Sequence, residues 1–267
     1  MLVELSVLSS AGLYLAIPWR PFSGSWVLKG LPIALLALQV IKLLLSPHFG
    51  DEQRHASELT ISILALALVL HCLGDVFLEL TMSLARSSLL VPAVAAFAAG
   101  HFLYMLAFLT DLHFPLFLQP SHWLGLLCIV LGGVFILNLV GFSSSLGLSV
   151  RTGDASNKKE SNTAKSRMDL TRYRKYLCVY VLLLVTMAML CLLSSASKQE
   201  NGSLWNLRTI GGSLYLISDG MIGMQAAQKG FPLLPPPFNH AIFNVFIWPC
   251  YYLGQYFIVM SMVDIHN

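Results

Sequence analysis

Long apolar runs separated by short polar segments dominate the pattern of this chain. An apolar run of roughly 17 to 25 residues is long enough to cross a bilayer as a helix. The pattern therefore predicts an all-α fold: one polytopic transmembrane helix bundle over residues 1–267, with about eight spans. The predicted spans are 2–18, which is short and carries Glu4, and 26–45, 59–80, 89–110, 121–141, 174–194, 207–227 and 239–262.

Two longer connections interrupt this pattern. Residues 46–57 are polar, and residues 142–173 are Ser-rich and then strongly basic. Because the second composition cannot bury a core, we expect a mobile basic loop within the transmembrane domain. Lys and Arg gather on the side of this loop, which the positive-inside rule makes cytosolic. A glycosylation sequon at Asn201 falls on the opposite side of the same topology.

Composition supports a membrane protein and excludes an ordinary soluble domain. Hydrophobic residues make up 56% and charged residues 11% of the chain, and its mean hydropathy is +0.72. The cysteines show no CxxC spacing, and each lies in an apolar run, where we interpret it as a small apolar residue. No metal-binding motif is present, so we expect no metal and no cofactor. The cysteines are Cys72, Cys128, Cys178, Cys191 and Cys250.

Two aspartates, Asp75 and Asp219, lie inside predicted spans. A carboxylate in hydrocarbon costs about 2.5 to 3.5 kcal/mol on insertion scales, so it indicates a functional site. His71, Asp75 and Glu79 are spaced i, i+4 and i+8, which places them on one helix face. We interpret His71 as a satisfied interior histidine and expect Glu79, at the span end, to reach the headgroups.

Other polar side chains lie in the predicted spans. Lys29 is either a snorkelling anchor at the headgroups or a contact for a phosphate group. His101 and Tyr104 share one face of a span. Gln255 lies in the middle of the last span together with Tyr252, and an amide at that depth needs a hydrogen-bond partner.

Five short motifs in this order resemble the lysoplasmalogenase family of eight-span membrane proteins, the YhhN-like group. The motifs are Lys29-Gly30-Leu31-Pro32, Gly74-Asp75-Val76-Phe77-Leu78, His101 with Tyr104 and Phe108, Gly211 followed by Ile217-Ser218-Asp219, and Tyr251-Tyr252 with Gln255. The chain departs from the family pattern at Leu90, Ala93 and Cys250, and the basic loop looks like an insertion. These departures leave the polar positions unchanged.

The resemblance implies hydrolysis of the vinyl ether bond of lysoplasmalogens to a fatty aldehyde and glycerophosphocholine or glycerophosphoethanolamine. Protonation of a vinyl ether carbon requires a neutral acid, and burial favours the neutral form of a carboxyl. We assign Asp219, expected to be the more desolvated carboxyl, as the general acid and Asp75 as the base, although the two could be exchanged. The substrate-binding residues would be Lys29 at the phosphate and Ser218, together with His101, Tyr104, Tyr252 and Gln255, which would orient the water or the glycerol hydroxyl.

The main alternative is a transporter in which Asp75, His101 and Asp219 form a proton or cation relay. A scaffold whose basic loop recruits anionic lipid is a second alternative. The expected partners are a lysophospholipid and the lipid bilayer, with no nucleic acid, and a homodimer is compatible with the sequence. We expect the protein in the endoplasmic reticulum membrane, with its active site toward the cytosol.

Overall fold

The computed structural model describes residues 9–12, 25–45, 54–83, 87–110, 112, 118, 120–145, 170–197, 207–228 and 238–263. This part of the chain is helical and contains no strand, which confirms the all-α prediction. The α-helices are α2 (Ser25–Leu44), α3 (Arg54–Ser83), α4 (Leu90–Thr110), α5 (Pro120–Ser145), α6 (Leu170–Ser197), α7 (Leu207–Gln228) and α8 (Phe238–Val263), and the 3-10 helix η1 (Ser87–Leu89) precedes α4.

Seven of the predicted spans match helices α2 to α8. The first predicted span lies outside the described residues, apart from a helical turn at 9–12. Two predicted connections were too wide. Residues 54–57 already belong to α3, and residues 142–145 and 170–173 belong to α5 and α6. The remainder of the basic segment, 146–169, lies outside the described residues.

Five helices of the described part, α2, α3, α4, α6 and α8, are long and apolar enough to cross a membrane. Helix α5 contributes a shorter apolar segment, His122–Asn138. Helix α7 carries Arg208 and Asp219, and it lies in contact with α5, α6 and α8. The chain is therefore an integral, polytopic membrane protein with an α-helical bundle.

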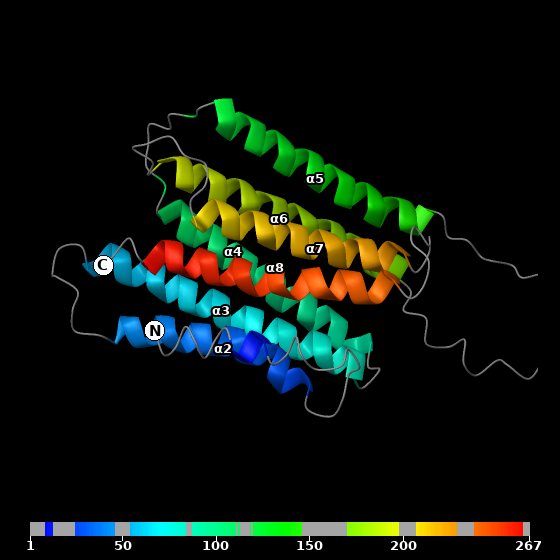
Figure 1. Ribbon diagram of the computed structural model, residues 1–267, viewed down its shortest axis with the longest axis horizontal. Coiled ribbons are helices and arrows are strands. Elements are labelled where there is room, and N and C mark those ends of the chain that lie inside the picture. The colour runs from blue at the N-terminus through cyan, green and yellow to red at the C-terminus, as the bar shows by residue number, and fades with distance from the viewer. Residues whose placement is uncertain are drawn as a thin grey trace, which may run out of the picture.

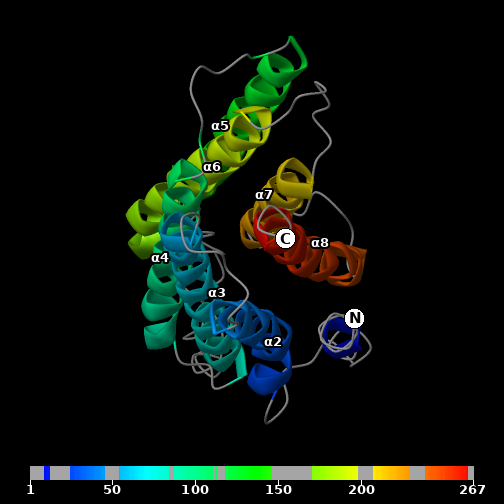
Figure 2. The ribbon, with the colours of Figure 1, turned by 90° about the vertical axis from the view of Figure 1, so that its left-hand side faces the viewer.

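The helices run side by side along the long axis of the molecule (Figure 1). Seen end-on in Figure 2, helices α5, α6, α4, α3 and α2 follow one another in a curved layer, and α7 and α8 form a pair on one side of it. Each helix of the layer packs on the next, whereas α8 makes few backbone contacts with α2 and α3. Long side chains therefore fill the space between the layer and the pair.

Glycines set two close approaches that position this region. A Cβ atom on Gly211 of α7 would lie 2.8 Å from the carbonyl oxygen of Gly254 in α8, so the two backbones are in direct contact. A Cβ atom on Gly100 of α4 would lie 2.4 Å from the ring of His71 in α3. The missing side chains let α7 lie against α8 and let the imidazole of His71 lie against the backbone of α4.

Candidate active site

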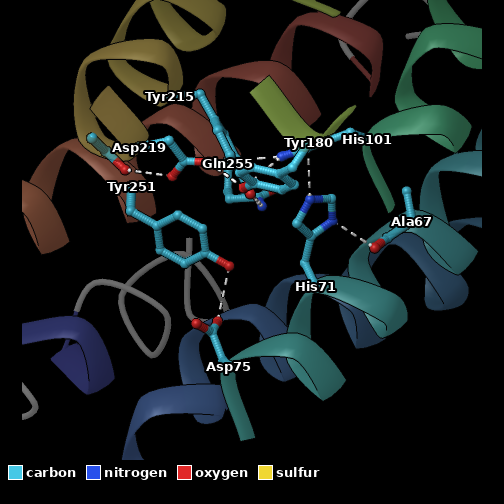
Figure 3. Close-up of polar contacts among 10 residues, drawn as sticks. Ala67, His71, Asp75, His101, Tyr180, Tyr215, Asp219, Tyr251 and Gln255 are labelled. Atoms are coloured by element: carbon cyan, nitrogen blue, oxygen red, sulfur yellow. Dashed lines mark hydrogen bonds and ion pairs between the residues drawn. The ribbon is translucent and has the colours of Figure 1, made fainter. Parts of the chain in front are cut away.

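Polar and aromatic side chains from α3, α4, α6, α7 and α8 meet between the curved layer and the α7–α8 pair (Figure 3). We call this group the polar seam. Its members from the layer are His71, Asp75, His101, Tyr104 and Tyr180, and its members from the pair are Tyr215, Ser218, Asp219, Tyr251 and Gln255. Six of the eight site residues expected from the sequence lie in it, and Lys29 and Tyr252 lie beside it on the α2 side.

Asp219 has hydrogen bonds at both carboxyl oxygens. Its Oδ2 atom is bonded to the hydroxyl of Tyr180 on α6. The hydroxyl of the neighbouring Ser218 donates to Oδ1 at 3.2 Å. The side chain of Asp219 is 7% exposed. Asp219 is thus enclosed and held at two points.

The hydrogen bonds continue from Tyr180 through two histidines to the backbone of α3 (Figure 3). The Tyr180 hydroxyl lies 3.0 Å from His101 Nε2, and His101 Nδ1 lies 3.2 Å from His71 Nε2. His71 Nδ1 donates to the carbonyl oxygen of Ala67 at 2.8 Å. Both histidines are fully buried. The interpretation of His71 as a satisfied interior histidine is confirmed.

Asp75 has a different environment. The hydroxyl of Tyr251 on α8 donates to Asp75 Oδ2 at 2.9 Å, and Figure 3 shows the Tyr251 ring pointing from α8 toward this carboxyl. The second oxygen, Oδ1, is buried and has no hydrogen-bond partner among the described residues. A buried carboxyl oxygen without a donor is energetically costly unless another group binds there. Asp75 therefore has one oxygen whose hydrogen-bonding capacity is not used within the described part of the chain.

The two carboxyls bond to different tyrosines but are close enough to interact electrostatically. Tyr215 lies between their environments, because its ring contacts those of both His101 and Tyr251, with centroids 5.0 and 5.3 Å apart. Burial does not rank the two acids as expected. Asp75 is fully buried while the Asp219 side chain keeps 7% exposure, so the expectation that Asp219 is the more desolvated was wrong. Asp75 is more buried than Asp219, although Asp219 lies nearer the centre of its span, because α3 is covered by α2, α4 and α8.

Tyr104 and Gln255 form a second set of hydrogen bonds. The Tyr104 hydroxyl donates to the amide oxygen of Gln255, whose nitrogen donates to the Tyr215 hydroxyl at 2.9 Å. His71 stacks on Tyr104 with ring centroids 5.0 Å apart. The buried amide thus has the partners that its depth requires, and it fixes the Tyr215 ring against the histidines.

Lys29 does not fit the interpretation as a snorkelling anchor, and its contact with a phosphate group stays a prediction. Its side chain is 2% exposed, and its ammonium lies 3.7 Å from Glu79 Oε2 and 4.1 Å from the centre of the Trp248 ring. It is therefore not snorkelling, and its charge is already balanced by a carboxylate. The expectation that Glu79 reaches the headgroups was also wrong, because α2 covers it and the Ser25 hydroxyl donates to its Oε1 at 2.5 Å.

The structure assigns different partners to the two adjacent tyrosines of α8. Tyr252 donates to the backbone carbonyl of Lys29 at 2.9 Å and ties α8 to α2, whereas Tyr251 bonds to Asp75. Tyr252 was the site residue expected from the sequence; Tyr251 was named only in the family motif, and Tyr180 and Tyr215 were not expected in the site. Tyr215 could have been found, because it precedes Asp219 by four residues and so shares its face. Tyr180 carried only the weak signal of a tyrosine inside an apolar run.

The described residues contain no group of three or more His, Cys, Asp or Glu side chains arranged to hold a metal ion. An apolar groove of about 560 Å³ lies between α5 and α7. Its lining residues Ser213, Ile217 and Gly220 lie on the face of α7 opposite Tyr215 and Asp219. The groove is thus separate from the polar seam, which offers carboxyl, imidazole and phenol groups for acid and base chemistry.

Comparisons with known proteins identify the family. The family model described as the YhhN family matches residues 24–262, which include every residue of the polar seam. The chain belongs to the YhhN family. No curated protein and no solved structure matches it. The resemblance inferred from the five motifs is therefore confirmed, and the polar seam is the polar centre of a YhhN family membrane protein.

Proposed function

We propose that this YhhN family protein is a lysoplasmalogenase, a hydrolase that cleaves the vinyl ether bond of alkenyl-lysophospholipids. The observation that carries the proposal is the pair of buried carboxyls with unequal hydrogen bonding. Asp219 is bonded at both oxygens, and Asp75 has one oxygen without a hydrogen-bond partner among the described residues. Vinyl ether hydrolysis needs an acid and a base in separate environments, as in glycoside hydrolysis, where the transition state also resembles an oxocarbenium ion.

In the first step Asp219 acts as the acid. Its proton moves to the β-carbon of the vinyl ether, whose π electrons form the new C–H bond, and the α-carbon becomes an oxocarbenium ion. Asp219 is left as a carboxylate. The Tyr180 and Ser218 hydroxyls then donate to its two oxygens. Donors already in place for a developing negative charge lower the barrier.

In the second step Asp75 acts as the base. Water at the free Oδ1 oxygen adds to the α-carbon and gives its proton to Asp75, which produces a hemiacetal. The hemiacetal then collapses: the Asp75 proton passes to the leaving glycerol oxygen, and the hemiacetal hydroxyl proton returns to Asp219. The products are a fatty aldehyde and a glycerophospho-alcohol, and both carboxyls regain their starting states.

Binding of the lipid would use the groups around the two acids. His101, Tyr104 and Gln255 line the polar seam and orient the reacting water and the glycerol. Lys29 would break its ion pair with Glu79 and bind the phosphate instead. The Tyr252 hydroxyl, which donates to the Lys29 carbonyl, would hold the Lys29 backbone in place. The single alkenyl chain would lie along the apolar helices. We place the enzyme in the endoplasmic reticulum membrane with its site toward the cytosol.

The chain of hydrogen bonds from Asp219 to His71 also bears on the alternative of a proton-coupled transporter. A conducting path needs an exchangeable group at each end. The far end of this chain is the Ala67 carbonyl in the middle of α3, which holds no exchangeable proton. This arrangement favours local acid and base chemistry over transport.

The test uses purified full-length protein in detergent. It is incubated with an alkenyl-lysophospholipid and, in parallel, with the acyl-lysophospholipid that has the same headgroup. We expect a fatty aldehyde from the first and no fatty acid from the second. Fatty acid from the second substrate would indicate a lysophospholipase, and release of neither product would refute hydrolysis of lysolipids by this chain.

A further inference from the structure

The hydrogen bonds that end at Asp219 allow its proton to be located by counting. Four contacts link Ala67, His71, His101, Tyr180 and Asp219, and each contact needs one hydrogen atom. The Ala67 carbonyl supplies none. A neutral histidine supplies one N–H, and a tyrosine supplies one O–H. Two histidines and one tyrosine therefore supply three hydrogens, and the fourth must be present on one of the groups.

Three placements of the fourth hydrogen fit all four contacts: on Asp219, on His101 or on His71. If Asp219 is a neutral carboxylic acid, Asp219 donates to Tyr180, which reverses the direction in which Tyr180 donates to a carboxylate oxygen of Asp219. The other donors then follow in order: Tyr180 to His101, His101 to His71, and His71 to Ala67. If Asp219 is a carboxylate, one of the histidines must be a cation. That arrangement creates a buried charge pair, and His101 Nε2 lies 3.7 Å from Asp219 Oδ2 without hydrogen-bonding it directly.

We infer that Asp219 carries this hydrogen, and that Tyr180, His101 and His71 are positioning residues that hold Asp219 as a neutral acid in the resting protein. The neutral arrangement leaves no charge in the buried chain, whereas two charges taken out of water carry a large desolvation cost. Ser218 fits the same arrangement, because its hydroxyl donates to Oδ1, the oxygen that would be the carbonyl of the acid.

This inference rests on the proposed function only for its consequence in catalysis. When Asp219 gives its proton to the vinyl ether, the chain falls one hydrogen short, and the Tyr180 hydroxyl can turn to donate to the new carboxylate. Return of the hemiacetal proton to Asp219 restores the full set of four hydrogen bonds. The positioning residues thus favour the protonated form before the reaction and its recovery afterwards.

The infrared spectrum of the purified protein in detergent at neutral pH tests the inference without any substrate. A neutral carboxylic acid has a C=O stretching band that a carboxylate lacks. We expect such a band in the wild-type protein, its loss in Asp219→Asn, and its retention in Asp75→Asn. In Tyr180→Phe the band should shift, because the phenol oxygen that accepts the hydrogen bond from Asp219 has been removed.

Tyr176→Phe is the matched control, since Tyr176 lies one turn earlier on α6 and is 54% exposed. It should leave the band in place. Absence of any band that depends on Asp219, dependence on Asp75 instead, or an unchanged band in Tyr180→Phe would overturn the inference. If the band behaves as expected but the wild-type protein releases no aldehyde, the inference about Asp219 stands and the proposed function fails.

Discussion

The two acids of the polar seam lie in regions that are built differently. At Asp219, a linear series of hydrogen bonds runs through one hydroxyl and two imidazoles to a backbone carbonyl, and each group in it has a partner. Around Asp75, one oxygen is bonded and the other is buried without a partner among the described residues. Charged groups lie on this second side, where Lys29 pairs with Glu79.

The difference shows that burial alone does not distinguish the two carboxyls. Both groups are enclosed, and the fully buried one is Asp75. What separates them is the number of hydrogens that their neighbours supply. The chain at Asp219 is one hydrogen short unless the carboxyl or one of the histidines carries an added proton, whereas Asp75 Oδ1 has no donor among the described residues.

The largest effect should come from replacing either carboxyl in the wild-type background. We expect Asp219→Asn and Asp75→Asn each to lower aldehyde release by roughly 10²- to 10⁴-fold, the range of a lost general acid or base. The asparagine amide at position 219 can still donate to Tyr180, so the Asp219→Asn protein should keep its unfolding temperature. Full turnover in either variant would remove that carboxyl from the mechanism.

The next effect concerns the charged pair on the Asp75 side. Lys29→Met or Glu79→Gln alone leaves one buried charge unpaired, which should lower the free energy of unfolding by about 3 to 5 kcal/mol. The double variant removes both charges and should recover most of this loss, so a double-mutant cycle by thermal unfolding in detergent measures the coupling. Lys42→Met, at an exposed position of the same helix, is the control.

The same double variant tests the phosphate contact assigned to Lys29. If it folds and turns over lysolipid with an unchanged KM, Lys29 does not bind the phosphate. A raised KM with retained folding supports the contact. Additive losses in the two single variants would instead mean that Lys29 and Glu79 do not act as a pair.

The sequence was sufficient to predict the helices and the two acids, because each depends on local information. A long apolar run predicts a spanning helix whatever surrounds it, and α2 to α8 match the predicted spans closely. Asp75 and Asp219 are conspicuous because a carboxyl within an apolar run is costly. The same logic identified Gln255 as a polar group that needed a partner.

Properties that depend on neighbouring helices could not be predicted in this way. Glu79 lies near a span end, and its burial becomes evident only from the packing of α2, which places Lys29 beside it. Tyr251 and Tyr252 are adjacent in sequence, so the choice of the one that bonds to Asp75 requires the rotation of α8. The role of Tyr180 follows from contacts between α6 and both α4 and α7, which no local pattern encodes.

The smallest expected effect concerns the far end of the Asp219 chain, where His71 lies against Gly100. A methyl group there would meet the imidazole at 2.4 Å, so Gly100→Ala must displace the ring and weaken its bond to His101. Overpacking of this kind costs about 1 to 3 kcal/mol of unfolding free energy. The control is Gly132→Ala on α5, where nothing lies within 4 Å of the added atom and a gain of about 0.5 to 1 kcal/mol is expected.

Because the chain from His71 holds the proton on Asp219, Gly100→Ala should also shift the infrared band of that acid, while Gly132→Ala should not. Equal stability of the two variants, or an unmoved band in Gly100→Ala, would show that the histidines do not constrain Asp219.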